Sequence, residues 1–135
     1  MKTNQEILDY LGQKIIEDCY DGSIRHIVSV RNKIDPPAIL KEKSDFLKSL
    51  SSEQFEILRK LTGSTVEIVL FEFLKIFEEH PEFKIIYEED GQQVDLNEIS
   101  EMLKAEPIIE DGWIERFSKE INKPSHIEDI QEEEK

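Results

Sequence analysis

The chain has 135 residues, of which 38% are hydrophobic, and its 31 acidic side chains outnumber 17 basic ones, for a net charge of −14. This length predicts one domain with a hydrophobic core of its own, and the charge disfavours nucleic acid and anionic membranes as partners. The single cysteine, Cys19, excludes an internal disulfide framework, and the absence of a signal-peptide pattern or a membrane-length apolar stretch predicts a soluble, cytoplasmic protein of bacterial type.

The first third of the chain predicts two helices. Thr3 and Glu6 have the spacing of a capping box, which opens a helix by satisfying free backbone amides. One helical face then carries apolar residues, namely Ile7, Leu8, Leu11, Ile15 and Cys19. The phase of this stripe shifts around Gly22, so we expect a break or kink there and a second helix that runs to about Lys33.

The middle of the chain also predicts helices. Asp35-Pro36-Pro37 is a start signal, because Asp can cap and Pro suits the first helical position. Ser51 and Gln54 form another capping-box pattern, and Gly63-Ser64 leaves open whether the helix that follows is broken or continuous. The segment Val66–Phe77 is apolar almost all round, which predicts the central, most buried helix.

A β-hairpin is predicted over residues 83–96. If Asp90-Gly91 form a two-residue type I′ turn, Tyr87 lies opposite Val94, and Ile85 lies opposite Leu96. The apolar residues then share one face of the ribbon, as expected for a hairpin that lies on a helical core.

After the hairpin, two more helices and a tail are predicted. Asp95 can cap a helix that runs through Lys104, and Asp111 can cap a last helix that carries Trp113 and Ile121. The expected fold is therefore mainly α: one domain over residues 1–121, with five to seven helices and one hairpin in the C-terminal half. Residues 122–135 are expected to form a polar, acidic and mobile tail.

The sequence carries no motif for catalysis, a cofactor or a metal. Its histidines are His26, His80 and His126, with no nucleophile elbow, phosphate loop or Cys-x-x-Cys nearby. Cys19 lies on the apolar stripe and is expected to be a buried, inert thiol. The cluster Glu78-Glu79-His80-x-Glu82 has metal-ligand residue types, but neighbouring helical side chains point about 100° apart, so an ordinary helix end is the simpler interpretation. We therefore expect no catalytic, cofactor-binding or metal-binding residues.

The negative charge is concentrated in the second half of the chain. Residues 1–77 carry 12 acidic and 11 basic side chains, whereas residues 78–135 carry 19 and 6. Without the last ten residues, this segment still has a charge of −9. Like charges on an ordered surface repel one another and cost stability. Binding of a cationic partner would explain why this segment nevertheless carries so many acidic side chains.

These observations predict a non-enzymatic, acidic module that binds a basic protein partner. The acids expected to attract the partner are Glu88, Glu89, Asp90, Glu110, Asp111 and Glu115. Trp113 is most simply a core residue, but its acidic surroundings would also suit an aromatic anchor, and Ile86 on the polar face of the hairpin has the same two interpretations. In size, acidity and cytosolic character the chain resembles the small bacterial immunity proteins and inhibitors that neutralise basic toxins or nucleases.

Three alternatives remain at this point. The acidic face could be solvated and have no partner. A small metal-assisted hydrolase could use acidic residues with His80 or His26. Finally, the chain could self-associate through an apolar face around Phe71, Phe73 and Ile76.

Overall fold

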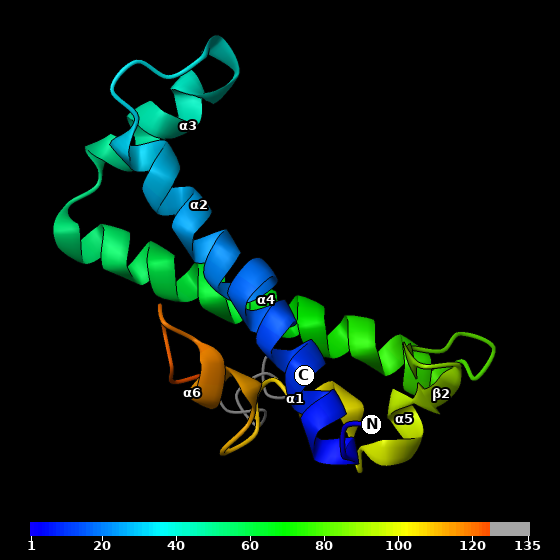
Figure 1. The fold of residues 1–135 in the computed structure, drawn as a ribbon. Helices are drawn as coiled ribbons and strands as arrows, with labels where there is room; N and C mark the ends of the chain where they lie inside the picture. Colours follow the sequence, from blue (N-terminus) through cyan, green and yellow to red (C-terminus); the bar gives the residue numbers. More distant parts are fainter. Residues whose placement is uncertain (125–135) are drawn as a thin grey trace.

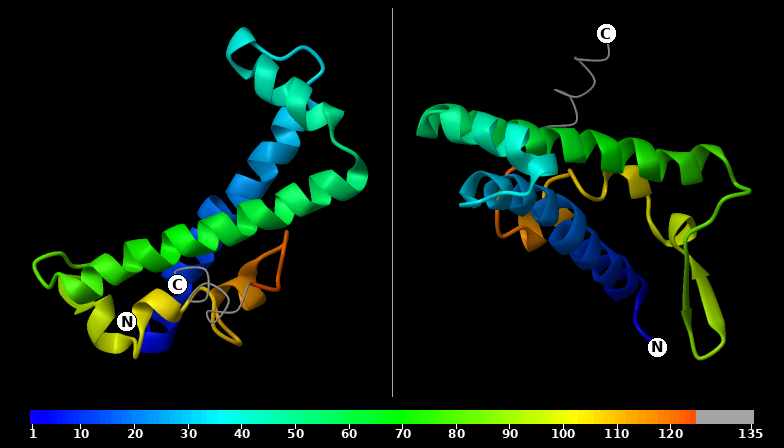
Figure 2. Two further views of the ribbon diagram at one scale, coloured as in Figure 1. Left: turned by 180° about the vertical axis from the view of Figure 1, so that it is seen from behind. Right: turned by 90° about the horizontal axis from the view of Figure 1, so that it is seen from above.

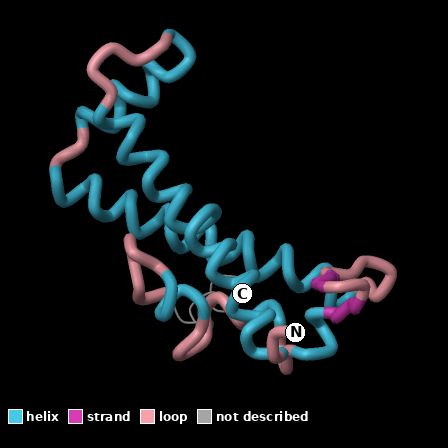
Figure 3. Tube along the Cα trace, viewed as in Figure 1, coloured by secondary structure: helices cyan, strands magenta, loops and turns pink. Residues whose placement is uncertain are grey.

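The computed structural model of the protein describes residues 1–124, so the acidic end of the predicted tail, residues 125–135 with His126, lies outside the described residues. The described chain is a mainly helical single domain with one antiparallel two-stranded hairpin in its C-terminal half (Figures 1 and 3). The predicted fold class is confirmed. The domain boundary at residue 121 stays a prediction.

Long helices form the first two thirds of the molecule, and short elements follow. The long helices are α1 (Asn4–Ile15), α2 (Asp21–Asn32), α3 (Ala38–Ser49) and α4 (Ser52–Glu79). The short elements are β1 (Ile86–Glu89), β2 (Gln92–Asp95), α5 (Leu96–Ile99), the 3₁₀ turn η2 (Leu103–Ala105) and α6 (Trp113–Phe117). In Figure 1, α1 and α2 form a diagonal that crosses α4, with α3 at one end and the hairpin and α5 at the other.

The first helix does not end near Gly22. A five-residue π-helical segment, Ile16–Tyr20, joins α1 to α2, and the three form one continuous helix. The wider π turn takes up an extra residue, which accounts for the shift of the apolar stripe without a break. It also buries Tyr20 and leaves Cys19 exposed. The prediction of a buried Cys19 is therefore wrong.

Helix α3 packs chiefly against α2, away from the main body. Pro37 takes its N-cap position without a side-chain hydrogen bond, so the capping role expected for Asp35 is not observed. A small core of Val30, Leu47 and Phe55 holds α3, α2 and the start of α4 together.

Helix α4 is continuous through Gly63 over 28 residues. Gly63 lies where α4 passes the π-helical segment, and a Cβ there would be 2.9 Å from the Tyr20 hydroxyl. Close packing thus explains a glycine in the middle of a helix that it does not break. The Ser51–Gln54 capping box that opens α4 is confirmed.

The hairpin has the predicted turn and register. Asp90 and Gly91 both have positive φ, at 52° and 80°, as a type I′ turn requires. Tyr87 pairs with Val94, and the Leu96 amide donates to the Ile85 carbonyl at 3.0 Å. Two of the apolar residues on this face, Ile85 and Tyr87, pack against the main core.

The chain after the hairpin is less helical than predicted. Asp95 caps α5 by accepting from the Asn97 amide at 3.0 Å, but α5 ends at Ile99. Ser100 follows in an extended conformation, and its hydroxyl donates to Glu106, so a local side-chain bond replaces helix continuation. Before α6 the N-cap is Gly112 rather than Asp111, which has a φ of 57°.

The main core lies where the α1–α2 helix, α4 and the C-terminal elements meet. Trp113 is fully buried there, among side chains such as Ile7, Leu74 and Leu103. When the molecule is seen from above, α4 lies along one edge, and the hairpin projects at its C-terminal end (Figure 2). Among the described residues, no helix combines the length and the apolar character needed to cross a membrane.

Candidate interaction surfaces

The exposed side of the hairpin meets α1 beside an apolar hollow. Ile86 is 42% exposed and Tyr10 is 51% exposed, although both are large apolar residues. They border a cavity of about 200 Å³ with a mostly apolar lining. The residues around the hollow are Ile7, Tyr10, Leu11, Lys14, Ile85, Ile86, Tyr87 and Leu96. A hollow of this size can accept one aliphatic side chain of a partner.

Three of the predicted acids lie at the tip of the same hairpin. Glu88 and Asp90 are exposed. Glu89 is partly covered and accepts a hydrogen bond from the Tyr87 hydroxyl at 2.7 Å, which lowers the pKa of the Glu89 carboxyl. Ile86, Glu88, Glu89 and Asp90 thus follow one another along β1 from the hollow to the turn, with Glu88 and Asp90 presented to solvent.

The other three predicted acids lie elsewhere. Glu110, Asp111 and Glu115 belong to the loop before α6 and to α6 itself, which Figures 1 and 2 show well apart from the hairpin. Glu115 accepts a hydrogen bond from the Asp111 amide at 2.8 Å, so these two residues shape the start of α6. The predicted acids therefore form two separate groups.

Trp113 contributes no exposed surface in this structure. Its exposed fraction is 0%, and its indole lies against Gly12 of α1, where a Cβ would be 2.5 Å from the ring. The simpler of the two interpretations, a core residue, describes its position.

The outer face of α4 is an apolar surface. Val66–Phe77 was expected to be the most buried helix, yet Val69, Phe73 and Ile76 are 58%, 53% and 43% exposed, and Phe73 and Ile76 belong to the face suggested above for self-association. Phe71, assigned above to a self-associating face, lies instead in the core. A helix that is apolar all round but covered on one side is typical of an interface.

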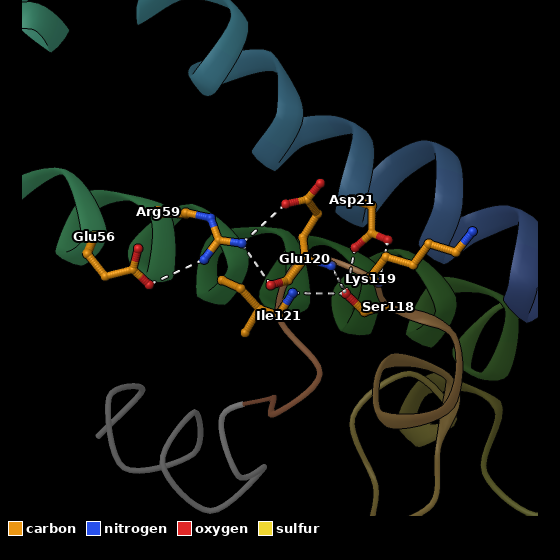
Figure 4. A network of polar contacts seen from close by, with 7 residues as sticks. All are labelled: Asp21, Glu56, Arg59, Ser118, Lys119, Glu120 and Ile121. Carbon is orange, nitrogen blue, oxygen red and sulfur yellow. Dashed lines mark hydrogen bonds and ion pairs between the residues drawn. The ribbon is translucent and has the colours of Figure 1, made fainter. Parts of the chain in front are cut away.

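A polar network ties the chain after α6 to the long helices (Figure 4). Asp21 of α2, only 1% exposed, accepts hydrogen bonds from the Ser118 hydroxyl at 2.6 Å and from the Lys119 amide at 2.9 Å. Arg59 of α4 donates to the Glu120 carbonyl at 2.7 Å and lies 3.2 Å from carboxylate oxygens of Glu120 and Glu56. These bonds attach the segment after α6 to both α2 and α4.

The features needed for the alternative hydrolase are dispersed. His26 lines a groove with Leu61, whereas His80 is the C-cap of α4, roughly 28 Å further along the helix axis at 1.5 Å per residue. His80 lies 3.3 Å from Glu82, and Glu78 pairs with Lys104 at 3.3 Å. Within residues 1–124, no three acidic, histidine or cysteine side chains are grouped as a metal site would require.

No protein-family model, no curated protein and no solved structure matches this chain.

Proposed function

We propose that this protein is a non-enzymatic binding module, and that it engages a basic protein partner through the end of the hairpin. The observation that carries the proposal is the position of Ile86, which is half exposed beside the apolar hollow, with Glu88 two residues further along the same face of β1. Asp90 of the turn lies beyond Glu88, about 13 Å from Ile86 at about 3.3 Å per residue. An apolar anchor surrounded by charge is the usual arrangement of a protein interface.

The chemistry of this surface indicates which side chains a partner would present. The hollow would take an aliphatic side chain, and Glu88 and Asp90 would attract lysine or arginine next to it in the partner. The net charge of −14 adds a long-range field that accelerates encounter with a cationic protein. An inhibitor- or immunity-type role, in which the basic partner is a toxin or nuclease, is the specific form of this proposal.

The proposal is tested with matched pairs of variants as bait for cell-extract proteins at low salt. Ile86→Arg removes the anchor and Glu88→Lys reverses one charge at the hairpin. Ile109→Arg and Glu110→Lys make the same changes elsewhere on the surface, and Ile109 has the same 42% exposure as Ile86. We expect a basic protein that is retained by the wild type and by both control variants but lost with the hairpin variants.

The retained protein is then purified, and its association rate is measured as salt is raised. Steering by the acids predicts a rate that falls steeply with ionic strength, and Glu88→Lys should slow association by about tenfold. An acidic partner, a rate that does not respond to salt, or equal loss with Glu110→Lys would contradict the proposal.

A further inference from the structure

An uncharged row of side chains runs along the exposed surface of α4. Its members are spaced four residues apart, so they form one ridge on the helix surface. They are Ile57, Leu61, Thr65, Val69 and Phe73. The four apolar members are 66%, 58%, 58% and 53% exposed, and Thr65 is exposed as well. None of the five carries a charge, so the exposed ridge offers no charged group along its length.

The row is nearly symmetric about Thr65, with two apolar residues on each side of it. If two copies of α4 cross in antiparallel orientation at Thr65, Ile57 meets Phe73 of the other copy and Leu61 meets its Val69. Packing of two such ridges is the commonest class of helix–helix contact, with a crossing angle of about −50°. A two-fold axis through Thr65 would therefore bury Leu61 of each copy against Val69 of the other. Ile57 and Phe73, which point about 80° to either side of Thr65 at about 100° per residue, would lie at the edges of the contact.

The distribution of charge also favours an antiparallel second copy. Residues 22–60, which form nearly all of α2, the whole of α3 and the start of α4, carry 8 basic and 5 acidic side chains. Residues 72–101, at the other end of α4, carry 2 basic and 10 acidic side chains. The N-terminal residues 1–15, partly beside the hairpin, add two of each sign and leave this contrast unchanged. The molecule is thus positive at the α3 end and negative at the hairpin end.

Antiparallel pairing places the negative end of each copy beside the positive end of the other. Parallel pairing would instead bring the two acidic ends together and set Glu72 beside Glu72 of the second copy, which costs free energy. The middle of the row, from Leu61 to Val69 and about 12 Å long at 1.5 Å per residue, would form the apolar centre of the contact, and the oppositely charged ends would form its rim.

We infer that the protein forms a two-fold symmetric dimer through the exposed row of α4, with the two helices antiparallel. This inference concerns a surface other than the hairpin end and does not depend on the proposed function. The occupant of the surface is a second copy of this chain, because the apolar row matches an equivalent row and the oppositely charged ends match each other when the two copies are antiparallel.

The first test is the mass in solution, measured by light scattering after gel filtration at high micromolar concentration. We expect twice the 15.9 kDa of the chain for the wild type. Leu61→Glu and Val69→Glu should weaken dimerisation by roughly 100-fold or more, because each buries charged groups in an apolar contact. Ile34→Glu changes a residue that is 98% exposed at the α2–α3 loop and should stay dimeric. A monomeric wild type would overturn the inference, as would equal loss of dimer with Ile34→Glu.

The second test fixes the orientation by cross-linking with a short bismaleimide, in a Cys19→Ser background. Thr65→Cys, on the axis, should cross-link to itself. Leu61→Cys and Val69→Cys should cross-link when the two variants are mixed, but not when either is alone. Self-linking of Leu61→Cys alone at the same rate would show a parallel pair and overturn the antiparallel geometry. Circular dichroism of each variant verifies that the helices are retained.

Discussion

Two helices separated by a hundred residues touch at Gly12. The indole of Trp113 at the start of α6 lies so close to α1 that a Cβ at residue 12 would be 2.5 Å from three ring atoms. Real Cβ atoms do not approach other heavy atoms so closely, so a larger residue requires Trp113 or α1 to move. Gly22, in the same continuous helix, has no neighbour closer than 3.8 Å to such a Cβ.

These two glycines give a matched pair of substitutions. Gly12→Ala should lower the free energy of unfolding by about 2–3 kcal/mol through overpacking. Gly22→Ala should raise it by about 0.5–1 kcal/mol, because alanine loses less backbone entropy in a helix. Urea unfolding followed by circular dichroism measures both. Similar effects of the two substitutions would show that the contact with Trp113 does not determine the choice of glycine at residue 12.

The Tyr20 hydroxyl is the second residue-scale feature with a measurable consequence. Burial raises the pKa of Tyr20 above its ordinary value of 10.0, and the nearby Glu67 and Asp21 carboxyls raise it further, while Arg59 opposes them. In the unfolded chain the phenol ionises near pH 10, but in the folded protein it stays protonated. Its contribution to stability is therefore fully present below pH 10 and is lost as the pH rises above it.

Tyr20→Phe should reduce this alkaline loss of stability. We expect the free energies of unfolding of the two proteins to differ by a constant between about pH 7 and 9, and the wild type to fall faster above pH 10. Tyr10→Phe, at an exposed tyrosine, is the control and should leave the slope as it is in the wild type. If the free energies of unfolding of wild type and Tyr20→Phe ran parallel up to pH 11, Tyr20 would not be the source of the alkaline loss of stability.

At the scale of the elements, local patterns predicted some structures well. The hairpin was predictable in register because two independent signals agree: Asp90-Gly91 requires one turn type, and that turn places Tyr87 opposite Val94. The capping boxes at Thr3 and Ser51 were predictable for the same reason, since each requires two residues at a fixed spacing.

Other elements depend on contacts that a single sequence does not display. A helix broken at Gly22 and a continuous helix with a π-helical segment would shift the apolar stripe in the same way. The local sequence therefore does not distinguish the two. Gly63 similarly resembles a helix breaker until Tyr20 is seen to pack against it. The end of α5 at Ile99 coincides with an extended Ser100, whose hydroxyl donates to Glu106 six residues further on.

Asp21 is one of the groups that hold the segment after α6, together with Arg59 and the packing of Ile121 on the core. Asp21→Ala removes the acceptor for the Ser118 hydroxyl and the Lys119 amide and should cost about 2 kcal/mol of stability. Asp18→Ala, at an exposed position of the neighbouring turn, should change stability by less than about 0.5 kcal/mol.

Limited proteolysis reports the same change locally. Trypsin cleavage after Lys119 should be faster in Asp21→Ala than in the wild type, because the segment is no longer fastened to α2. Cleavage after Lys119 at the wild-type rate, despite lowered global stability, would indicate that Arg59 alone suffices to hold the segment.

At the scale of the whole molecule, the two hydrophobic cores differ in size. The main core gathers side chains from α1, α4 and the C-terminal elements, whereas the core under α3 consists of Val30, Leu47 and Phe55 with a few partly buried neighbours. Because α3 packs chiefly on α2, it can open without disturbing the rest.

Hydrogen exchange should therefore separate these regions. We expect amides of residues 41–49 to exchange with a lower protection free energy than amides of residues 66–78 in α4. Leu47→Ala should accelerate exchange in α3 and leave the centre of α4 almost unchanged. Equal protection in both regions would mean that the molecule unfolds only as one unit.

The candidate surfaces were predictable only in part, and the reason is their dependence on the whole fold. Glu88, Asp90 and Ile86 are neighbours in sequence and remain neighbours in space. Glu110 and Glu115 were expected to join them, but the path of the chain between β2 and α6 carries them elsewhere. The exposed row of α4 could not be found from apolarity alone, because Phe71 and Phe73 look alike until the covered side of the helix is known.

The position of Trp113 gives the protein an intrinsic optical probe. It is the only tryptophan in the sequence, and its indole nitrogen is buried without a hydrogen-bond partner among residues 1–124. Its fluorescence should therefore be blue-shifted in the folded state and should report the docking of α6 on α1. Opening of α3 would leave that emission unchanged while lowering the helical signal in circular dichroism. The two signals, recorded in one titration, can thus distinguish partial opening from global unfolding without any label.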